Sequence, residues 1–321
     1  MRVAHLIIVP LVGCSTLLGI QDPVGDGSGT GSMRPDAGNG SDDGGTEPTV
    51  DHLTFSAGNT VTLMSAQHMR FRVMLVHNGV PTDATVMSGF SLTTDAAGTV
   101  ATLVTKDAAG AETFDTVASG LVHITAKLTG VTPAVDSIMM TVNITDATCH
   151  PVINEVATGT TARGASDEYA EIYNPCTVAF DVSSWTLKYR GSGANGPGVT
   201  GDTNTLTTFG SGDSMPPGDI RLYAGSGYAG TVAAKATFPT GTGLGSAGGA
   251  VGLRDEADVL VDSMAYVGAT TSNPFDETNP VANIPINSSA MRGPFDGNDS
   301  NNNVGDFVLS ATPTPGTLNQ P

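Results

Sequence analysis

The stretch that decides the fold is residues 166–190, which read SDEYAEIYNPCTVAFDVSSWTLKYR. In its first half Ile172 can face a core while the Glu and Tyr beside it point the other way, which is the two-residue alternation of a strand. In its second half Trp185, the only tryptophan of the chain, stands two residues before Leu187 and shares its face. We expect two strands joined through an Asn-Pro turn, with Trp185 as a core anchor. Stacking of its indole on carbohydrate is the alternative role.

The strand pattern extends over most of the 321 residues. The chain has 41 glycines and many Thr, Val, Ser and Asn residues, which favour turns and strands over helices. No long stretch has apolar residues at helical spacing, so the sequence predicts an all-β protein. Before the decisive stretch, strands are expected at the spacing typical of a β-sandwich, at residues 51–56, 61–65, 69–77, 90–94, 100–105, 121–127 and 137–144.

Two segments in the first half of the chain resemble a known module. They are TTDAAGTVATLVTKDAAG at residues 93–110 and VASGLVHITAKLTG at residues 117–130. They are similar to bacterial Ig-like repeats, whose hallmark is a Gly-led strand of the form G-x-V-x-I-T-A, here residues 120–126. The resemblance covers residues 50–146 and implies a domain that serves spacing or adhesion and seldom carries chemistry.

A second series of motifs begins at Cys149. Besides the stretch quoted first, it consists of CHPVINEVAT (149–158), MPPGDIRLYAG (215–225), GGAVGLRDEADVLVDSMAYVG (248–268) and SSAMRGPFDGNDSNNNVGDFVLSATPTPGTLN (288–319). In this order the motifs resemble the lamin-tail domain, an Ig-like β-sandwich of nuclear lamins and many secreted bacterial proteins. The resemblance covers residues 149–321, and together the two resemblances imply two Ig-like β-sandwiches. Ser184 departs from the family pattern, which usually has Gly before the tryptophan, and so does a Gly/Thr-rich insertion at residues 191–212.

The first fourteen residues have the pattern of an export signal. Met1-Arg2 is a short basic region, residues 3–12 are mostly apolar, and Leu11-Val12-Gly13-Cys14 resembles the lipobox of bacterial lipoproteins. The apolar run is far too short to span a membrane as a helix. The resemblance implies removal of residues 1–13, acylation of the Cys14 thiol, and a lipoprotein at the outer membrane or cell surface. An ordinary secretory signal with a chance cysteine is the alternative.

Residues 14–49 form the predicted connection between the lipidated cysteine and the folded part. From residue 21 to residue 49 they contain no aromatic side chain and are dominated by Gly, Ser, Asp and Pro. Such a segment cannot offset its ordering entropy by burial. We expect a flexible acidic linker with a typical reach of about 30 Å.

Two further cysteines, Cys149 and Cys176, remain once Cys14 is acylated. Export places them in an oxidising compartment, where paired thiols persist as disulfides. Cys149 precedes the first expected strand of the C-terminal module and Cys176 follows the second, so antiparallel pairing of those strands would bring the two sulfurs together. We predict this disulfide. The rival interpretation is a metal site of Cys149 and His150, which lacks enough ligands of its own.

Three glutamates of the C-terminal module, Glu155, Glu168 and Glu171, raise the question of catalysis. Glycoside hydrolysis needs two carboxyl groups about 5–10 Å apart across a cleft, a spacing that neighbouring strands can provide. The resemblance instead implies roles in turn and strand-end hydrogen bonding. The chain has no G-x-S-x-G elbow and no P-loop, and we expect no catalytic residues and no enzyme activity.

The strongest ligand candidate is the loop of residues 296–306. Its oxygen-bearing side chains, Asp296, Asn298, Asp299 and Asp306, suit Ca²⁺, which prefers six to eight oxygen ligands. The loop lacks the EF-hand order. The alternative is an Asx-turn loop in which these side chains bond their own backbone, and beyond calcium no cofactor is expected.

The formal charge of −18 would repel a phosphate backbone, so no nucleic-acid partner is expected. The hypothesis is a non-enzymatic surface lipoprotein whose modules bind or organise extracellular or envelope material, with a polysaccharide or protein as partner. Residues 191–212 and 296–306 are the expected contact loops, because sandwiches carry function on their end loops. Two alternatives stay open. One is the targeting or display component of an extracellular hydrolase system, a nuclease or phosphohydrolase, and the other is a purely structural envelope protein.

Overall fold

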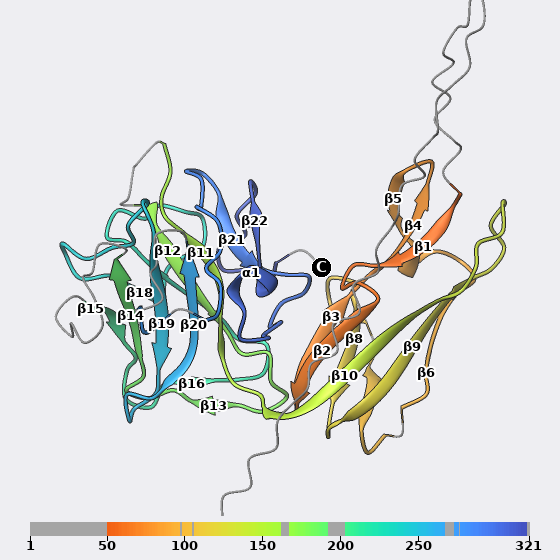
Figure 1. The fold of residues 1–321 in the computed structure, drawn as a ribbon, viewed down its shortest axis with the longest axis horizontal. Helices are drawn as coiled ribbons and strands as arrows, with labels where there is room; N and C mark the ends of the chain where they lie inside the picture. Colours follow the sequence, from red (N-terminus) through yellow and green to blue (C-terminus); the bar gives the residue numbers. More distant parts are fainter. Residues whose placement is uncertain are drawn as a thin grey trace, which may run out of the picture. The chain divides into compact units, whose positions relative to one another are not determined.

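The computed structural model describes residues 50–96, 98–104, 106–161, 167–191, 203–266, 273–275 and 277–319. Nearly all regular structure in this part of the chain is β-strand, which confirms the all-β sandwich fold (Figure 1). The predicted signal, Cys14 and the linker up to residue 49 lie outside the described residues. Within the described ranges, no helix has the length and apolar character needed to cross a membrane.

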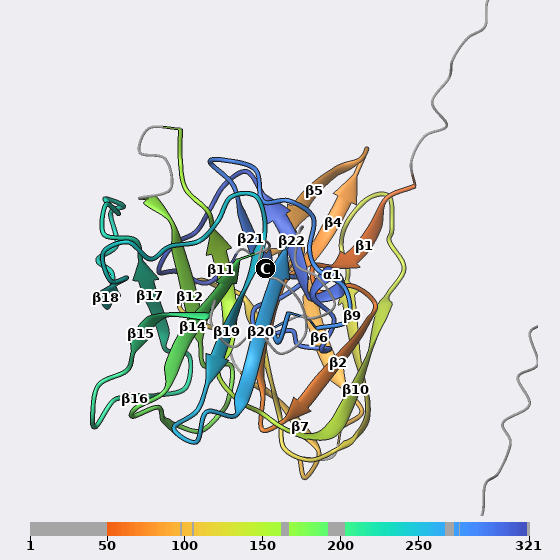
Figure 2. The same cartoon turned by 60° about the vertical axis from the view of Figure 1, so that its left-hand side comes forward.

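The N-terminal sandwich comprises residues 50–148. A four-stranded sheet, β2-β10-β9-β6, and two three-stranded sheets, β1-β4-β5 and β3-β8-β7, share one apolar core that includes Phe71, Phe114 and Met140. The long strands β9 and β10 run side by side (Figures 1 and 2). The elements are β1 His52–Phe55, β2 Thr60–Ser65, β3 His68–Phe71, β4 Val73–His77, β5 Val80–Asp83, a 3₁₀ turn Ala84–Val86, β6 Phe90–Thr94, β7 Ala101–Val104, β8 Glu112–Thr116, β9 Gly120–Leu128 and β10 Ile138–Thr148.

The prediction of a single strand at residues 69–77 is wrong in one respect. The chain leaves one sheet and enters another at Arg72, which separates β3 from β4. The backbone of Arg72 binds Ser56 instead of a strand neighbour: its N–H donates to Ser56 Oγ at 2.8 Å and its carbonyl accepts from Ser56 N at 2.9 Å. Phe71 and Val73 on either side are both fully buried, so both strands turn alternate residues toward the core although the strand is divided.

The C-terminal sandwich comprises residues 149–319. Its sheets are six-stranded (β18-β17-β12-β11-β21-β22), four-stranded (β15-β14-β19-β20) and two-stranded (β13-β16). The elements are β11 Val152–Ala157, β12 Tyr169–Tyr173, β13 Phe180–Asp181, β14 Thr186–Gly191, β15 Thr203–Thr208, β16 Ser214–Met215, β17 Ile220–Ala224, β18 Ala236–Thr237, β19 Gly249–Arg254, β20 Leu260–Tyr266, β21 Ser289–Arg292, α1 Asn303–Asp306 and β22 Phe307–Ser310.

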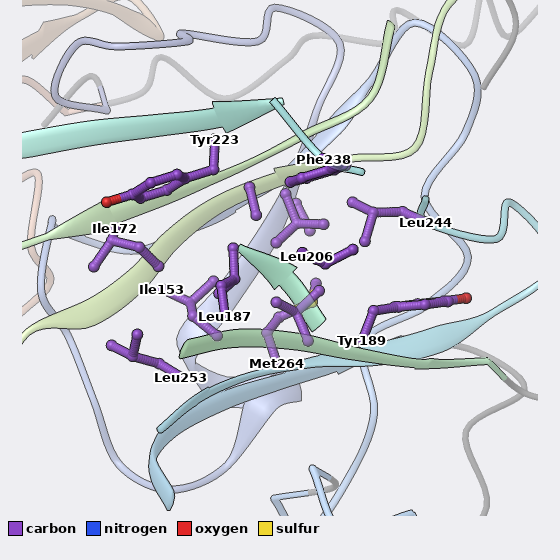
Figure 3. Close-up of a cluster of buried hydrophobic side chains, with 14 of the residues drawn as sticks. Ile153, Ile172, Leu187, Tyr189, Leu206, Tyr223, Phe238, Leu244, Leu253 and Met264 are labelled. Carbon is purple, nitrogen blue, oxygen red and sulfur yellow. The ribbon is translucent and has the colours of Figure 1, made fainter. Parts of the chain in front are cut away.

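The core of this sandwich lies between the six-stranded and four-stranded sheets. Ile153 and Ile172 pair across β11 and β12, and their side chains point toward Leu187 and Leu253 of the other sheet (Figure 3). Trp185 is 5% exposed within the same core, and its Nε1 donates to Glu256 Oε2 at 3.0 Å. Its predicted role as a core anchor is confirmed, and so little of the indole is exposed that it cannot stack on a carbohydrate.

The insertion at residues 191–212 is only partly described, because residues 192–202 lie outside the described ranges. Residues 203–208 form β15, an edge strand paired with β14. Leu206 is fully buried, and Phe209 stacks on Tyr223 with ring centroids 4.8 Å apart. This half of the insertion is therefore a strand anchored to the core by apolar side chains and not a loop, and its role as a contact surface stays a prediction.

Candidate functional site

Two glutamates lie opposite each other on the face of the six-stranded sheet that is turned away from the core. Glu155 of β11 pairs in register with Glu171 of β12, and neither side chain is exposed. The alternation predicted around Ile172 explains the placement of Glu171, because Ile172 faces the core and its neighbour must face the opposite side. Glu155 reaches the same face because the register of β11 shifts between Ile153 and Glu155. Buried carboxylates need hydrogen-bond donors, and the donors here come from the C-terminal segment (residues 311–319).

Backbone amides of this segment bind both glutamates. Thr314 N–H lies 3.1 and 3.2 Å from the two carboxylate oxygens of Glu155, and its hydroxyl donates to Oε2 at 3.1 Å. Gly316 N–H donates to Glu171 Oε2 at 2.6 Å. The segment belongs to no sheet, so its N–H groups must find acceptors elsewhere. The carboxyl groups of Glu155 and Glu171 provide them.

Asp296 is the third carboxylate of this arrangement. Its Oδ1 accepts from Asn319 N at 2.9 Å and from Asn154 Nδ2 at 3.1 Å. The same amide of Asn154 donates to Glu171 Oε1 at 3.0 Å, which ties the two acids together. We call Glu155, Glu171 and Asp296 the carboxylate clamp, because all three hold the C-terminal segment on the sheet.

Burial changes the acidity of the clamp. It raises the pKa of Glu171 to about 8, and the neighbouring charge of Glu155 acts in the same direction. Burial also raises the pKa of Asp296 to about 6, against the hydrogen bonds from Asn319 and Asn154, which lower it. A raised pKa suits a general acid, but here the proton is held beneath a covering segment instead of facing a cleft.

Glu168, the third glutamate considered for catalysis, lies apart from this pair. It contacts the turn before β19, where its Oε2 accepts from Leu244 N at 2.7 Å. A Cβ on Gly243 would lie 2.1 Å from Glu168 Oε1, so the carboxylate needs glycine beside it. Burial raises the pKa of Glu168 to about 7. The structure thus brings Glu155 and Glu171 together and gives Glu168 a separate structural contact.

The loop of residues 296–306 surrounds a buried arginine. The Nη2 of Arg292 donates to both oxygens of Asp262 at 2.8 and 2.7 Å, while its Nε donates to the carbonyl of Ile153 at 2.7 Å. Asp299 Oδ1 and Asp306 Oδ2 lie 3.7 and 3.8 Å from its Nη1. Burial alone would lower the pKa of Arg292, but the three carboxylates raise it above its ordinary value, so the guanidinium is the cation of this loop.

The four residues considered for calcium fall into two groups. Asp296 belongs to the carboxylate clamp, whereas Asp299 and Asp306 face Arg292. Asn298 donates its amide to Asp306 Oδ1 at 2.9 Å, and Asp306 Oδ2 accepts from the backbone N–H of Ser300 at 2.9 Å. An Asx turn is also present in the loop, because Asn301 N–H donates to Asp299 Oδ1 at 3.2 Å. The four side chains do not converge on one point, and calcium binding stays a prediction.

Sequence reasoning missed two acids beside this loop, Asp262 of β20 and Glu277. With Asp299 they place one oxygen each within 4.8 Å of one another. Glu277 accepts from Ser263 N and Oγ at 3.0 and 2.9 Å, and burial raises its pKa to about 8. In the sequence, the only indication of this acidic group was the pair Asp262-Ser263 in the motif at residues 248–268. Because Arg292 already binds Asp262 with two hydrogen bonds, the protein supplies the positive charge that this acidic group needs.

The predicted disulfide between Cys149 and Cys176 is confirmed, with Cα atoms 5.7 Å apart. The antiparallel pairing of β11 with β12 sets Val152 opposite Tyr173, three residues from each cysteine, as the prediction required. Both sulfurs are bonded to each other, so the metal site of Cys149 with His150 is excluded.

The disulfide lies where the two sandwiches meet. Cys176 and Gln67 form an isolated β-bridge, and Gln67 Nε2 donates to the carbonyl of Gly297 at 2.7 Å. Gly297 has φ +76°, and a Cβ there would lie 2.4 Å from Cβ of Pro175, so a side chain would be both strained and obstructed. Phe295, two residues earlier, packs in the N-terminal core. The sandwiches are thus joined by specific side-chain contacts besides the chain itself.

Comparisons with known proteins give no family. No family model matches the sequence, and no curated protein does. Among solved structures, the chain is similar to a DUF4876 family protein from Bacteroides thetaiotaomicron, with 10% identity and a TM-score of 0.36 over 80% of this chain and 94% of that one. It is also similar to InvD of Yersinia pseudotuberculosis, with 14% identity and a TM-score of 0.18 over 68% and 69% of the two chains. At these TM-scores neither likeness bears on function.

Proposed function

We propose that this chain is a non-enzymatic lipoprotein, displayed outside the cell, that binds or organises extracellular or envelope material through its C-terminal sandwich. Lipid on Cys14 anchors it, and residues 14–49 hold the sandwiches away from the membrane. The partner is an extracellular polysaccharide or protein. A net charge of −18 disfavours nucleic acid, because non-specific affinity for DNA comes from neutralising its phosphates.

The carboxylate clamp is the observation that carries the proposal. Glu155 and Glu171 are two carboxyl groups that neighbouring strands place opposite each other. A glycosidase needs such a pair at an open cleft that admits substrate and water. Here each carboxylate is fully buried and accepts hydrogen bonds from the segment that covers it. This favours an architectural role for the motif acids and leaves the surfaces around them for binding.

Anchoring is tested with the variant Cys14→Ser. We expect it to move the protein from the detergent-extracted membrane fraction to the soluble fraction, because the serine hydroxyl cannot accept the lipid. The control is a conservative change outside the signal, Ser15→Thr, which should stay in the membrane fraction. Unchanged partition of Cys14→Ser would contradict the lipoprotein and leave an ordinary secretory signal.

Binding is separated from catalysis by two measurements on the purified full chain. We expect no turnover of phosphodiester or glycan substrates, and we expect pull-down of extracellular polysaccharide or protein from the source culture. Capture of a secreted hydrolase as the main partner would favour the display component of a hydrolase system, and no capture at all would favour a purely structural protein. Turnover that disappears in Glu155→Gln or Glu171→Gln would overturn the proposal in favour of an enzyme.

A further inference from the structure

A cavity of about 270 Å³ lies where the C-terminal segment crosses the end of the six-stranded sheet. Its walls are rings: Tyr169 at the start of β12, Tyr228, and the two prolines of the segment, Pro313 and Pro315. The two tyrosines meet edge to face, with ring centroids 6.1 Å apart and planes at 75°. The cavity is just below the ~300–1,000 Å³ typical of pockets for drug-sized ligands, so it has room for one small ring.

Polar side chains, among them Asp167, Asn287 and Thr160, also line this cavity, which we call the tyrosine–proline pocket. Asp167 is held in place, because its Oδ2 accepts from Thr160 Oγ1 at 3.0 Å and its Oδ1 from Ala229 N at 3.2 Å. Asn287 is also oriented, since its carboxamide oxygen accepts from Thr161 N at 2.9 Å. That bond leaves the amide Nδ2 with capacity to donate. The rim thus offers fixed acceptors and a donor around flat apolar walls.

The charge of the pocket restricts its ligand. Among the described residues that line the pocket, Asp167 is the one ionisable carboxyl group and none is Lys or Arg, in a chain of net charge −18. An anionic ligand would be repelled. A neutral ligand with one apolar face and polar edges fits best.

We propose that the tyrosine–proline pocket binds one neutral sugar residue, such as the end of an extracellular glycan. The C–H face of the sugar packs on Tyr228, Pro313 and Pro315, with the buried ring of Tyr169 supporting Tyr228, and its hydroxyl groups bind Asp167, Asn287 and Thr160. Few polar groups at fixed positions then set orientation while apolar contact supplies affinity. The inference rests on the proposed function, for which it names the ligand class and the site.

The carboxylate clamp has a role in shaping this pocket. Thr314 and Gly316, which bind Glu155 and Glu171, flank Pro315 on either side. The clamp therefore fixes the proline wall without itself lining the pocket. Glu171 is a positioning residue for the sugar. Its removal should weaken binding, because Gly316 loses its hydrogen bond and Pro315 is no longer held in place.

The test is calorimetric titration of the full chain, kept in detergent, with neutral oligosaccharides ending in glucose, mannose, galactose or N-acetylglucosamine. We expect at least one to bind. Tyr228→Ala should weaken that binding at least tenfold, whereas Tyr228→Phe should keep it within about threefold, because the ring supplies the contact. Glu171→Ala should weaken binding as well. Val308→Ala, on the exposed edge strand β22, is the matched control and should bind as the unaltered chain does.

Three results would contradict the assignment of this pocket to a neutral sugar: no neutral oligosaccharide binds, Tyr228→Ala binds the oligosaccharide unchanged, or choline or an acidic sugar binds more tightly than the neutral oligosaccharides. Thermal melting of Tyr228→Ala distinguishes loss of the site from loss of the fold. If Tyr228→Ala still captures extracellular material in the pull-down, the pocket is wrong while the proposed function stands. If the chain cleaves the bound sugar, the proposed function fails as well.

Discussion

The two sandwiches bury different kinds of side chain. Among the described residues of the N-terminal sandwich, Arg70 is the one charged side chain that is buried, and the core is otherwise made of aliphatic, aromatic and Met residues. The C-terminal sandwich has an equally apolar core between its sheets. In addition it buries a series of charged residues: Glu155, Glu168, Glu171, Arg190, Asp262, Arg292, Asp296 and Asp306.

The difference follows from what each sandwich must hold in place. In the N-terminal sandwich most of the backbone is in sheets, which satisfy its N–H and C=O groups. The C-terminal sandwich packs long segments outside its sheets, above all residues 293–302 and 311–319. Their N–H groups need acceptors, and buried carboxylates provide them. Acidic motifs in a β-sandwich can therefore mark segments held by side chains and need not mark active sites.

The largest expected effect compares the two buried arginines. Arg292→Met removes the cation that compensates three carboxylates, and it should lower the free energy of unfolding by about 3–5 kcal/mol. Arg70 binds Asp107, which is 22% exposed, and lies 3.6 Å from Asp296. Because one partner is hydrated, Arg70→Met should cost less, about 1–2 kcal/mol. Urea denaturation measures both. Equal losses would show that the two sandwiches do not differ in this way.

The next effect concerns the disulfide, which closes a loop inside the C-terminal sandwich with a sequence separation of 27. Replacing Cys149 and Cys176 by serine should cost about 3 kcal/mol, because the unfolded chain regains loop entropy. Thiol titration of the denatured, unreduced protein should find neither cysteine free. Two reactive thiols in the exported chain, or a double variant as stable as the parent, would contradict the assignment.

The third effect is a pH dependence specific to the C-terminal sandwich. Glu171 has a pKa of about 8 when folded, against an ordinary value of 4.5. Between these values the folded protein keeps a proton that the unfolded chain releases. The stability linked to Glu171 is therefore complete below pH 4.5 and is lost as pH rises to 8. Glu171→Gln mimics the protonated carboxyl, so it should gain on the parent over this range, by on the order of 2 kcal/mol at pH 6.

The control for this pH dependence of stability is Asp181→Asn. The pKa of the exposed Asp181 is lowered by hydrogen bonds from Ser183, so its contribution changes only in acid, below its ordinary value of 3.8, and the profile from pH 5 to 8 should not change. Melting temperatures across that range give both curves. If Glu171→Gln and the parent run parallel from pH 5 to 8, the carboxyl is not buried as described.

Local alternation in the sequence predicted much of the fold. Ile172, Leu187 and Trp185 were correctly assigned to the core, because alternate residues of a strand face opposite sides and the local sequence shows which side is apolar. What covers the opposite face was not predictable, because the partners of Glu155 and Glu171 come from residues about 150 positions later. The sheet change at Arg72 depends on Ser56, and the strand β15 was hidden by a Gly/Thr-rich composition that is typical of loops. Contacts between distant segments set these features.

The smallest expected effect concerns Ser184. It has φ +65° at the third position of a turn closed by Trp185 N–H on the carbonyl of Val182 at 3.1 Å, where glycine is favoured. Glycine adopts a positive φ without this strain. Ser184→Gly should raise stability by about 0.5–1 kcal/mol by relieving left-handed strain, whereas Ser184→Ala should not. Chemical denaturation of both variants decides, and stabilisation by Ala alone would contradict this explanation.

The central claim is that buried carboxylates hold the C-terminal segment, and amide hydrogen exchange at Thr314 and Gly316 tests it most directly. Both N–H groups should exchange slowly in the full chain, because each donates to a buried carboxylate. In Glu171→Ala the Gly316 amide should exchange at least tenfold faster, while Thr314, held by Glu155, should keep more of its protection. Fast exchange of both amides in the unaltered chain, or no change at Gly316 in Glu171→Ala, would contradict the clamp.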